Sequence, residues 1–125
     1  VLGFEQVSFS YAARPGQPAH EAATKALDNI SLVVQPGETV ALVGRSGMGK
    51  STFVALINRF YDPTEGRVTY AGVDLRDVDK ATLRAHVAIV PQNPALFSDT
   101  FAENIRLGRQ DASDAEIEAA AKRAN

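Results

Sequence analysis

Cysteine is absent from this chain of 125 residues, which excludes disulfides and thiolate metal sites and agrees with a reducing compartment. The net charge of −2 gives no bulk attraction for nucleic acid, and we expect no nucleic-acid partner. No apolar run approaches the ~20 residues that a membrane helix needs, and no signal peptide precedes the first strand pattern. The composition therefore predicts one small soluble domain. Because the chain opens on Val1 rather than Met, we expect it to be part of a longer protein.

Histidine is also scarce. The two histidines, His20 and His86, have no second ligand at metal spacing, and we expect both to be structural or solvent-facing. Residues 74–79 are acidic, but Arg76 and Lys80 interrupt the negative charge. Mixed charge of this kind favours a solvated face over a metal site.

The stretch Gly44–Ser51 fits the pattern G-x-x-x-x-G-K-[ST] at every fixed position. Residues 38–43 before it predict a buried strand, and residues 52–60 after it predict a helix that opens at Lys50. A strand, a glycine loop and a helix form the context in which this pattern indicates phosphate binding. Without those flanks, the alternative is a glycine-rich turn with a surface lysine.

The chemistry of this loop follows from its backbone. Glycines let successive N–H groups face one concavity, and the helix adds its unpaired first-turn N–H groups and the positive end of its dipole. Lys50 would place a charge on the outer phosphates, and the Ser51 hydroxyl would complete an Mg²⁺ shell. The residues expected to bind the nucleotide phosphates are Gly44, Arg45, Ser46, Gly47, Met48, Gly49, Lys50, Ser51 and Thr52.

The rest of the chain alternates strand and helix patterns, which predicts an α/β fold. Strands are expected at residues 2–11, with a slip between Phe4 and Val7, and at 30–34, 67–70 and 87–90; residues 12–25 read as an exposed loop. A helix over Lys80–Ala85 would be capped by Asp79. Further helices would start at capping boxes headed by Thr100 and Ser113, and Gly108 suits the end of the first of these.

Two residues outside the loop could serve a nucleotide. Tyr11 ends the first strand, where its ring could stack on a purine, although taken alone it is better explained as a strand-end core residue. Gln92 follows the 87–90 strand, at the carboxyl end where ligands of open α/β sheets bind. Its amide can offer a carbonyl to Mg²⁺ and a donor to water or phosphate. Taken alone, Gln92 would be an ordinary loop residue.

Together these segments resemble the ATPase domain of an ATP-binding cassette (ABC) transporter of the bacterial exporter type. The matching segments occur in order along nearly the whole chain, and this order is more specific than the glycine loop alone. They are Val7–Tyr11, Ala26–Leu32, Pro36–Gly44, Arg59–Pro63, Gly66, Val90–Gln92, Leu96–Thr100 and Glu103–Ile105.

The resemblance implies a P-loop NTPase fold, with a RecA-like core and an antiparallel β subdomain. It divides the chain into an adenine-binding β region (1–37), a core from the Walker A loop to the Q-loop (38–92) and the start of the helical subdomain (93–125). It also implies truncation before the helical signature subdomain is complete and before the Walker B strand. No Ser-Gly-Gly-Gln signature, Walker B acidic pair or switch histidine occurs in this chain.

The resemblance also assigns roles. ATP and Mg²⁺ are the expected ligands; Tyr11 would stack on adenine, Lys50 and Gln92 would act in catalysis, and Ser51 and Gln92 would hold the metal. Leu96 and Phe97 fall where the family receives coupling helices of a membrane domain, here expected to be fused to the ATPase domain. The implied location is the cytoplasmic face of the inner (plasma) membrane.

A second ATPase domain, paired head to tail, would complete each site. The full-length protein would hydrolyse ATP, whereas this chain alone should bind nucleotide weakly and turn over little. Its missing core strands predict instability or oligomerisation in isolation. Residues 12–25 are longer than the family's usual link, which leaves the pose of Tyr11 open.

Two other functions remain possible from the sequence. One is a soluble ABC ATPase of DNA repair or chromosome maintenance, although the exporter-like run Arg59–Pro63 argues against it. The other is a non-catalytic, nucleotide-dependent binding module. The residues that follow in the whole protein would separate these, and apolar spans upstream would identify an exporter.

Overall fold

The computed structural model describes residues 1–12 and 25–125, which form two compact units, Val1–Ala88 and Ile89–Asn125. The first unit contains β1 (Leu2–Ser10), β2 (Lys25–Val34), α1 (Lys50–Ile57), β3 (Glu65–Tyr70), β4 (Val73–Asp74), the short helix η2 (Leu75–Asp77) and α2 (Lys80–His86). The second unit contains α3 (Phe101–Arg106) and α4 (Asp114–Ala124). The loop predicted over residues 12–25, with His20, lies almost entirely outside the described residues.

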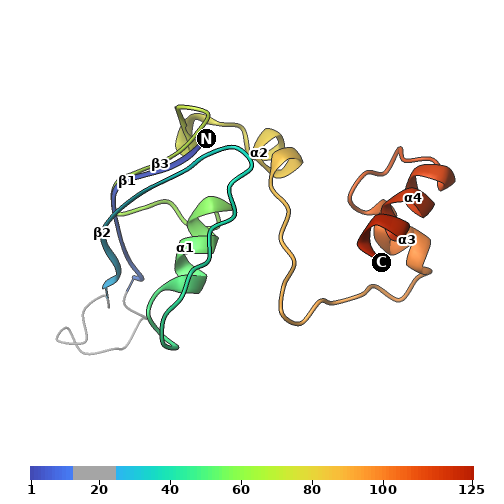
Figure 1. The fold of residues 1–125 in the computed structure, drawn as a ribbon, viewed down its shortest axis with the longest axis horizontal. Helices are drawn as coiled ribbons and strands as arrows, with labels where there is room; N and C mark the ends of the chain where they lie inside the picture. Colours follow the sequence, from blue (N-terminus) through green and yellow to red (C-terminus); the bar gives the residue numbers. More distant parts are fainter. Residues whose placement is uncertain (13–24) are drawn as a thin grey trace. The chain divides into compact units, whose positions relative to one another are not determined.

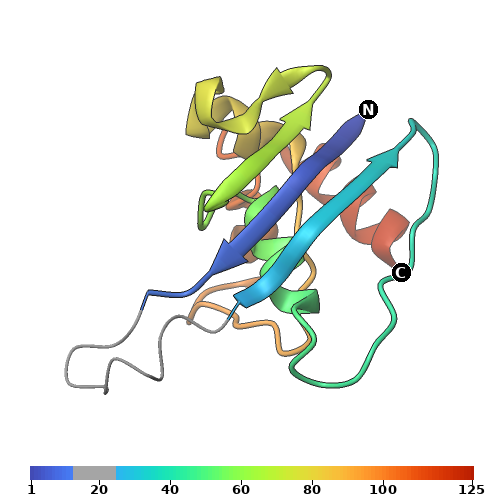
Figure 2. The same cartoon turned by 90° about the vertical axis from the view of Figure 1, so that its left-hand side faces the viewer.

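The strands of the first unit form an antiparallel sheet in the order β2-β1-β3-β4, and Figure 2 shows its three long strands side by side. The slip predicted in the first strand is confirmed, because the register with β2 shifts between Phe4 and Val7. Gln6 has a φ of 49° at this point and donates its N–H to the Ser31 hydroxyl at 3.0 Å. The irregularity bends β1 without leaving this amide unpaired.

The helix α1 lies against one face of this sheet (Figure 1). The rings of Phe4 on β1 and Phe53 on α1 stack with centroids 4.0 Å apart and planes 10° apart. The buried core comprises Phe4, Val7, Phe9, Leu27, Phe53, Leu56, Val68, Leu75 and Leu83. Burying each large apolar side chain stabilises a fold by about 1.5–3 kcal/mol, so this core holds the start of α1 against β1 and β2.

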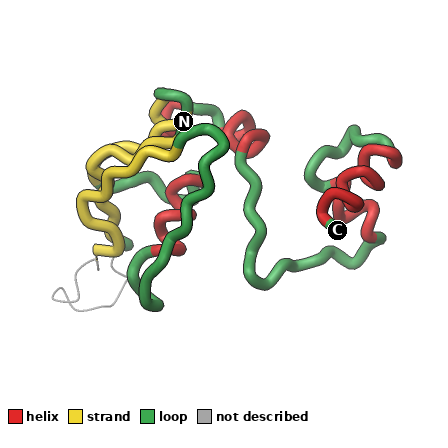
Figure 3. The backbone as a smooth tube through the Cα atoms, viewed as in Figure 1, coloured by secondary structure: helices red, strands yellow, loops and turns green. Residues whose placement is uncertain are grey.

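Two predicted strands are wrong. Residues 38–43 and 87–90 carry no strand, and Figure 3 shows both segments as loop. Val87 is half-buried against the core, but the other apolar side chains of these segments are exposed, Val43 by 90% and Val90 by 94%. A buried strand of a parallel sheet needs a neighbour on each edge. The described residues supply none for either segment, so the local pattern alone does not make a strand.

The helix predictions fare better because their signals are local. α1 begins at Lys50 as predicted, but it ends at Ile57 rather than at residue 60, since Arg59 adopts a φ of 52°. α2 is confirmed, with the Asp79 carboxylate accepting the Thr82 N–H at 3.0 Å. This hydrogen bond is the main reason that the pKa of Asp79 is lowered.

In the second unit both predicted helices are present, and they differ at their starts. Ser113 forms a complete capping box with Glu116. At Thr100 the hydroxyl accepts the Glu103 N–H at 3.1 Å, while the N–H of Thr100 itself donates to the Asp99 carboxylate at 2.7 Å. No helix in the part of the chain that the structure describes is long and apolar enough to cross a membrane.

Candidate functional site

The glycine loop takes a backbone path that requires glycine at two points. Gly47 and Gly49 have φ values of 84° and 83°, in the left-handed region that side chains disfavour. A Cβ on Gly49 would also collide with the backbone oxygen of Ala26 on β2. A Cβ on Gly47 would meet nothing within 4 Å, so the space beside that residue is open. The loop therefore packs closely on β2 at one glycine and faces open space at the other.

Lys50 folds back over the loop that precedes it. Its Nζ donates to the backbone oxygens of Gly44 at 2.6 Å and of Arg45 at 2.7 Å. An ammonium group has three donors, so these two bonds leave one donor for an anion. The cation thus lies beside the loop amides, where a phosphate would meet both.

The start of α1 carries no cap of its own. Among the α-helices in the described parts of the chain, α1 alone has no side-chain hydrogen bond at its N-cap, and its first turn holds no acidic residue. Asp79, Thr100 and Ser113 cap the other three. The first-turn N–H groups of α1 therefore have no side-chain partner, and the dipole favours an anion at this end.

A hollow of about 380 Å³ opens between this loop, the start of α1, the residue that follows β1 and the start of β2. It is lined by Tyr11, Lys25, Ala26, Ser46, Gly47, Gly49, Lys50, Ser51 and Thr52. The structure thus brings Tyr11, 33 residues before Gly44 in the numbering, to the same hollow as the glycine loop. The sequence alone could not establish this contact.

Tyr11 and Thr52 meet inside the hollow. The Tyr11 hydroxyl and the Thr52 Oγ1 lie 2.8 Å apart, within hydrogen-bond distance. Thr52 is only 4% exposed, whereas Tyr11 keeps 40% of its surface exposed. The hydroxyl of Thr52 is therefore already engaged by Tyr11, and the exposed part of the ring remains available to a ligand.

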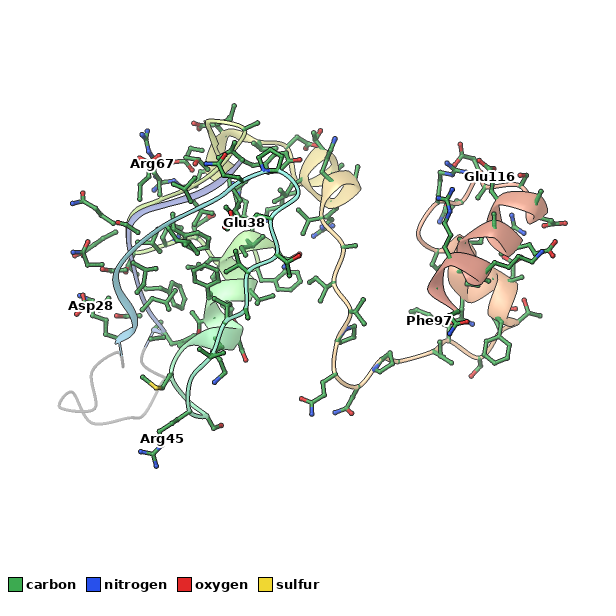
Figure 4. The ribbon with its side chains drawn as sticks, viewed as in Figure 1. Asp28, Glu38, Arg45, Arg67, Phe97 and Glu116 are labelled. Carbon is green, nitrogen blue, oxygen red and sulfur yellow. The ribbon has the colours of Figure 1, made fainter. Side chains whose placement is uncertain are left out.

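The other side chains of the glycine loop are exposed, which indicates that the loop would bind a ligand mainly through its backbone N–H groups. Arg45 lies at the tip of the loop and its side chain extends away from α1 (Figure 4). Met48 is exposed, as are Ser46 and Ser51. Ser51 lies in the first turn of α1 and lines the hollow. Its side chain is exposed, and its hydroxyl oxygen suits Mg²⁺.

Two residues at this site were missed by the sequence analysis. Lys25 at the start of β2 lines the hollow, and its Nζ lies 2.5 Å from an Asp28 carboxylate oxygen. That hydrogen bond raises the pKa of Lys25, so the hollow keeps a second cation at neutral pH. Tyr61 contacts the ring of Tyr11, with centroids 5.4 Å apart. Lys25 lies in no motif. Tyr61 lies in the run Arg59–Pro63, which indicated the family but gave no reason to place this tyrosine beside a ligand.

Gln92 is the exception among the predicted site residues. It lies in the second unit, exposed, in a segment without helix or strand. The hollow is built entirely from the first unit. The site described here therefore contains Tyr11 and residues of the 44–52 stretch, and it does not contain Gln92.

The donor set fits a magnesium nucleotide. Lys25, Lys50 and the uncapped amides of α1 suit phosphate oxygens, and an exposed aromatic ring suits a base. In the described ranges, no cluster of three or more histidine, cysteine, aspartate or glutamate side chains could hold a metal ion. The Ser51 hydroxyl, which lines the hollow, would suit Mg²⁺ as a ligand.

Comparison with known proteins identifies the family of this chain. The family model described as ABC transporter matches residues 27–125. The chain is 53% identical, over 99% of its length, to the mitochondrial potassium channel ATP-binding subunit of Xenopus tropicalis, and it spans 17% of that protein. It is 48% identical to the ATP-dependent lipid A-core flippase of Chromobacterium violaceum, covering 99% of this chain and 20% of the flippase.

A solved structure shares the fold. It is described as a bacterial Atm1-family ABC exporter with ATP bound, and it matches with a TM-score of 0.81 and 44% identity. The match covers 97% of this chain and 20% of the exporter. Because the family model matches most of its length, the chain belongs to the ABC transporter family.

Proposed function

We propose that this chain is the ATP-binding part of the ATPase domain of an ABC exporter. The observation that carries the proposal is the arrangement at the start of α1, where Lys50 lies over the glycine loop beside helix amides that no side chain caps. The likeness to an exporter described with ATP bound supports the same ligand.

In this proposal each group has one task. Lys50 and the loop amides bind the β- and γ-phosphates, Tyr11 stacks on adenine, and Ser51 binds Mg²⁺. Gln92, which does not line the hollow described above, would join the metal and contact the attacking water in the complete domain. Mg²⁺, when bound, would neutralise charge that develops on the phosphates. The proposed regions are 1–37 for the base, 38–92 for the phosphates and 93–125 for the start of the helical subdomain.

The proposal includes partners. A second ATPase domain would pair head to tail with this one, and the coupling helices of a membrane domain would dock on the loop that carries Leu96 and Phe97. Both side chains are exposed. The side chain of Asn104 holds that loop in place, since its Oδ1 accepts the Phe97 N–H at 2.8 Å and its Nδ2 donates to the Thr100 oxygen at 2.9 Å. An exposed apolar pair on a fixed loop suits a docking role. The complete exporter would lie with these domains at the cytoplasmic face of the membrane.

The test is Lys50→Ala in the complete exporter. Each charge-assisted hydrogen bond is worth about 1.5–3 kcal/mol, so loss of one bond to phosphate should weaken Mg·ATP binding roughly 10- to 150-fold and abolish ATP-driven transport. The matched control is Lys80→Ala, because Lys80 is likewise the first residue of a helix, α2, and is exposed. Wild-type ATP hydrolysis in Lys50→Ala would overturn the proposal, and equal losses in both variants would attribute the effect to folding.

A further inference from the structure

The ring of Tyr11 is held on more than one side. Phe9 lies with its centroid 4.9 Å away and its plane at 88°, and Tyr61 lies 5.4 Å away at 86°. Phe9 and Tyr61 also contact each other, with centroids 5.4 Å apart. The hollow is lined by Tyr11 but by neither of its two ring neighbours. Those neighbours therefore cover a part of Tyr11 other than the part that faces the hollow.

Tyr61 owes its position to a turn that is fixed at both ends. At one end, Arg59 donates from Nη1 to the Val78 oxygen at 2.7 Å and from Nε to Asp62 at 3.2 Å. At the other end, Thr64 donates both its N–H and its hydroxyl to the oxygen of Ser8 on β1, at 3.0 and 2.9 Å. The turn is therefore fastened to the same strand that leads to Tyr11.

The hydroxyl of Tyr11 is held independently. Its partner, Thr52, lies in the first turn of α1 and is almost fully buried. The ring is thus tied to the phosphate-binding helix at its polar end and braced by aromatic rings along its apolar part. Such a ring is already oriented before a ligand arrives, which lowers the entropy cost of binding.

We propose that Tyr61 is a positioning residue for nucleotide binding, which acts by bracing Tyr11 in the orientation that receives the base. This inference rests on the proposed function, because it takes Tyr11 to be the residue that stacks on adenine. Tyr61 itself does not line the hollow. Its effect should therefore fall on the base and spare the phosphates.

The experiment compares two probes, Mg·ATP and magnesium tripolyphosphate, by titration calorimetry on the complete exporter. A well-oriented aromatic pair is worth the equivalent of roughly a 2- to 10-fold change in affinity, so Tyr61→Ser should weaken Mg·ATP binding by that factor and leave tripolyphosphate unchanged. Tyr61→Phe keeps the ring and should bind like wild type. Tyr70→Ser is the matched control, since Tyr70 is the remaining tyrosine and its ring lies near His86.

A cycle with Tyr11→Ala tests whether Tyr61 acts through Tyr11. If it does, the double variant should bind Mg·ATP no more weakly than Tyr11→Ala alone, because the brace has nothing left to hold. Additive losses, or equal losses for both probes, would overturn the inference. Tyr61→Leu, which keeps apolar bulk without an aromatic edge, replaces Tyr61→Ser if that variant does not fold, and it should show the same loss confined to Mg·ATP.

The outcomes also separate this inference from the proposed function. If Tyr11→Ala weakens Mg·ATP binding and Tyr61→Ser does not, the positioning role is wrong and the nucleotide site stands. If Tyr11→Ala has no effect while Lys50→Ala does, the base does not stack on Tyr11 and both assignments to these tyrosines fail.

Discussion

Gly49 and Lys50 are neighbours at the start of α1 and show two different ways in which one residue type can be required. Gly49 is required by geometry, since its backbone is left-handed and an added side chain would collide with the backbone oxygen of Ala26. Lys50 is required by charge, since its ammonium group supplies donors beside the loop. The pattern G-x-x-x-x-G-K-[ST] combines both requirements in adjacent positions.

The glycines give a graded prediction at this scale. Gly47→Ala should cost about 1–2 kcal/mol of unfolding free energy, because a left-handed conformation is imposed on alanine. Gly49→Ala has a similar φ and adds a backbone collision, so it should cost more. Thermal unfolding of the domain that contains the chain measures the difference. Equal losses for the two variants would show that the close contact with Ala26 has no energetic weight.

Residue contacts are also where prediction from sequence reached its limit. The loop, Tyr11 and Ser51 were named from their residue types and spacing. The bond between Tyr11 and Thr52 and the ring contact between Tyr11 and Tyr61 join positions far apart in the chain. No periodicity or motif encodes such contacts, because they depend on how β1, α1 and the turn after α1 pack.

Among the elements, the helix starts that have a local capping signal were predicted. Of the predicted strands, those at 2–11, 30–34 and 67–70 are present in the sheet, and those at 38–43 and 87–90 are not. Asp79, Thr100 and Ser113 each accept an N–H group within their own helix start, so the sequence holds the whole interaction. Residues 38–43 and 87–90 have strand-like composition, yet a strand is completed only by hydrogen bonds to a neighbour. These two predictions are wrong because neither segment has a neighbouring strand to pair with in the described residues, although the composition of both is strand-like.

The cap of α4 gives a pH prediction. Hydrogen bonds from the Ser113 N–H and hydroxyl, at 2.9 Å each, together with an ion pair to Arg109, lower the pKa of Glu116 from 4.5 to about 2. A folded-state pKa below the unfolded value stabilises the fold above the unfolded pKa. The stabilisation of α4 by this cap should therefore be fully present above about pH 4.5, and it should be lost as the pH falls towards about 2.

Amide hydrogen exchange at the start of α4 measures this effect. Protection of the first-turn amides should fall between pH 4.5 and pH 2 once the intrinsic exchange rate is corrected. In Glu116→Gln the same amides should show no such step, because the amide side chain does not titrate. A step of equal size in both proteins would mean that another group controls the helix start.

At the scale of the whole molecule, the described residues include a packed core and two segments that expose apolar side chains. The antiparallel sheet and α1 share a closed core. The segments 38–43 and 87–90 expose apolar side chains, among them Val43 by 90% and Val90 by 94%. The expectation that the isolated chain is unstable or oligomeric stays a prediction that agrees with these exposed side chains.

Family membership indicates the size of the protein in which this nucleotide site would work. The chain spans 17% of one relative and 20% of another, so its site would work within a much larger protein. We expect hydrolysis and transport, as proposed above, to need groups other than those described in this chain. What the chain itself supplies is the place for the nucleotide, and the central claim of this account concerns that place.

The most direct test is a structure of the complete exporter with Mg²⁺ and a non-hydrolysable ATP analogue. The account predicts that the adenine ring contacts Tyr11, that the amides of Gly44–Ser51 surround the phosphates, and that Lys50 Nζ leaves the oxygens of Gly44 and Arg45 for a phosphate. A nucleotide bound away from this loop, or a base with no contact to Tyr11, would contradict it.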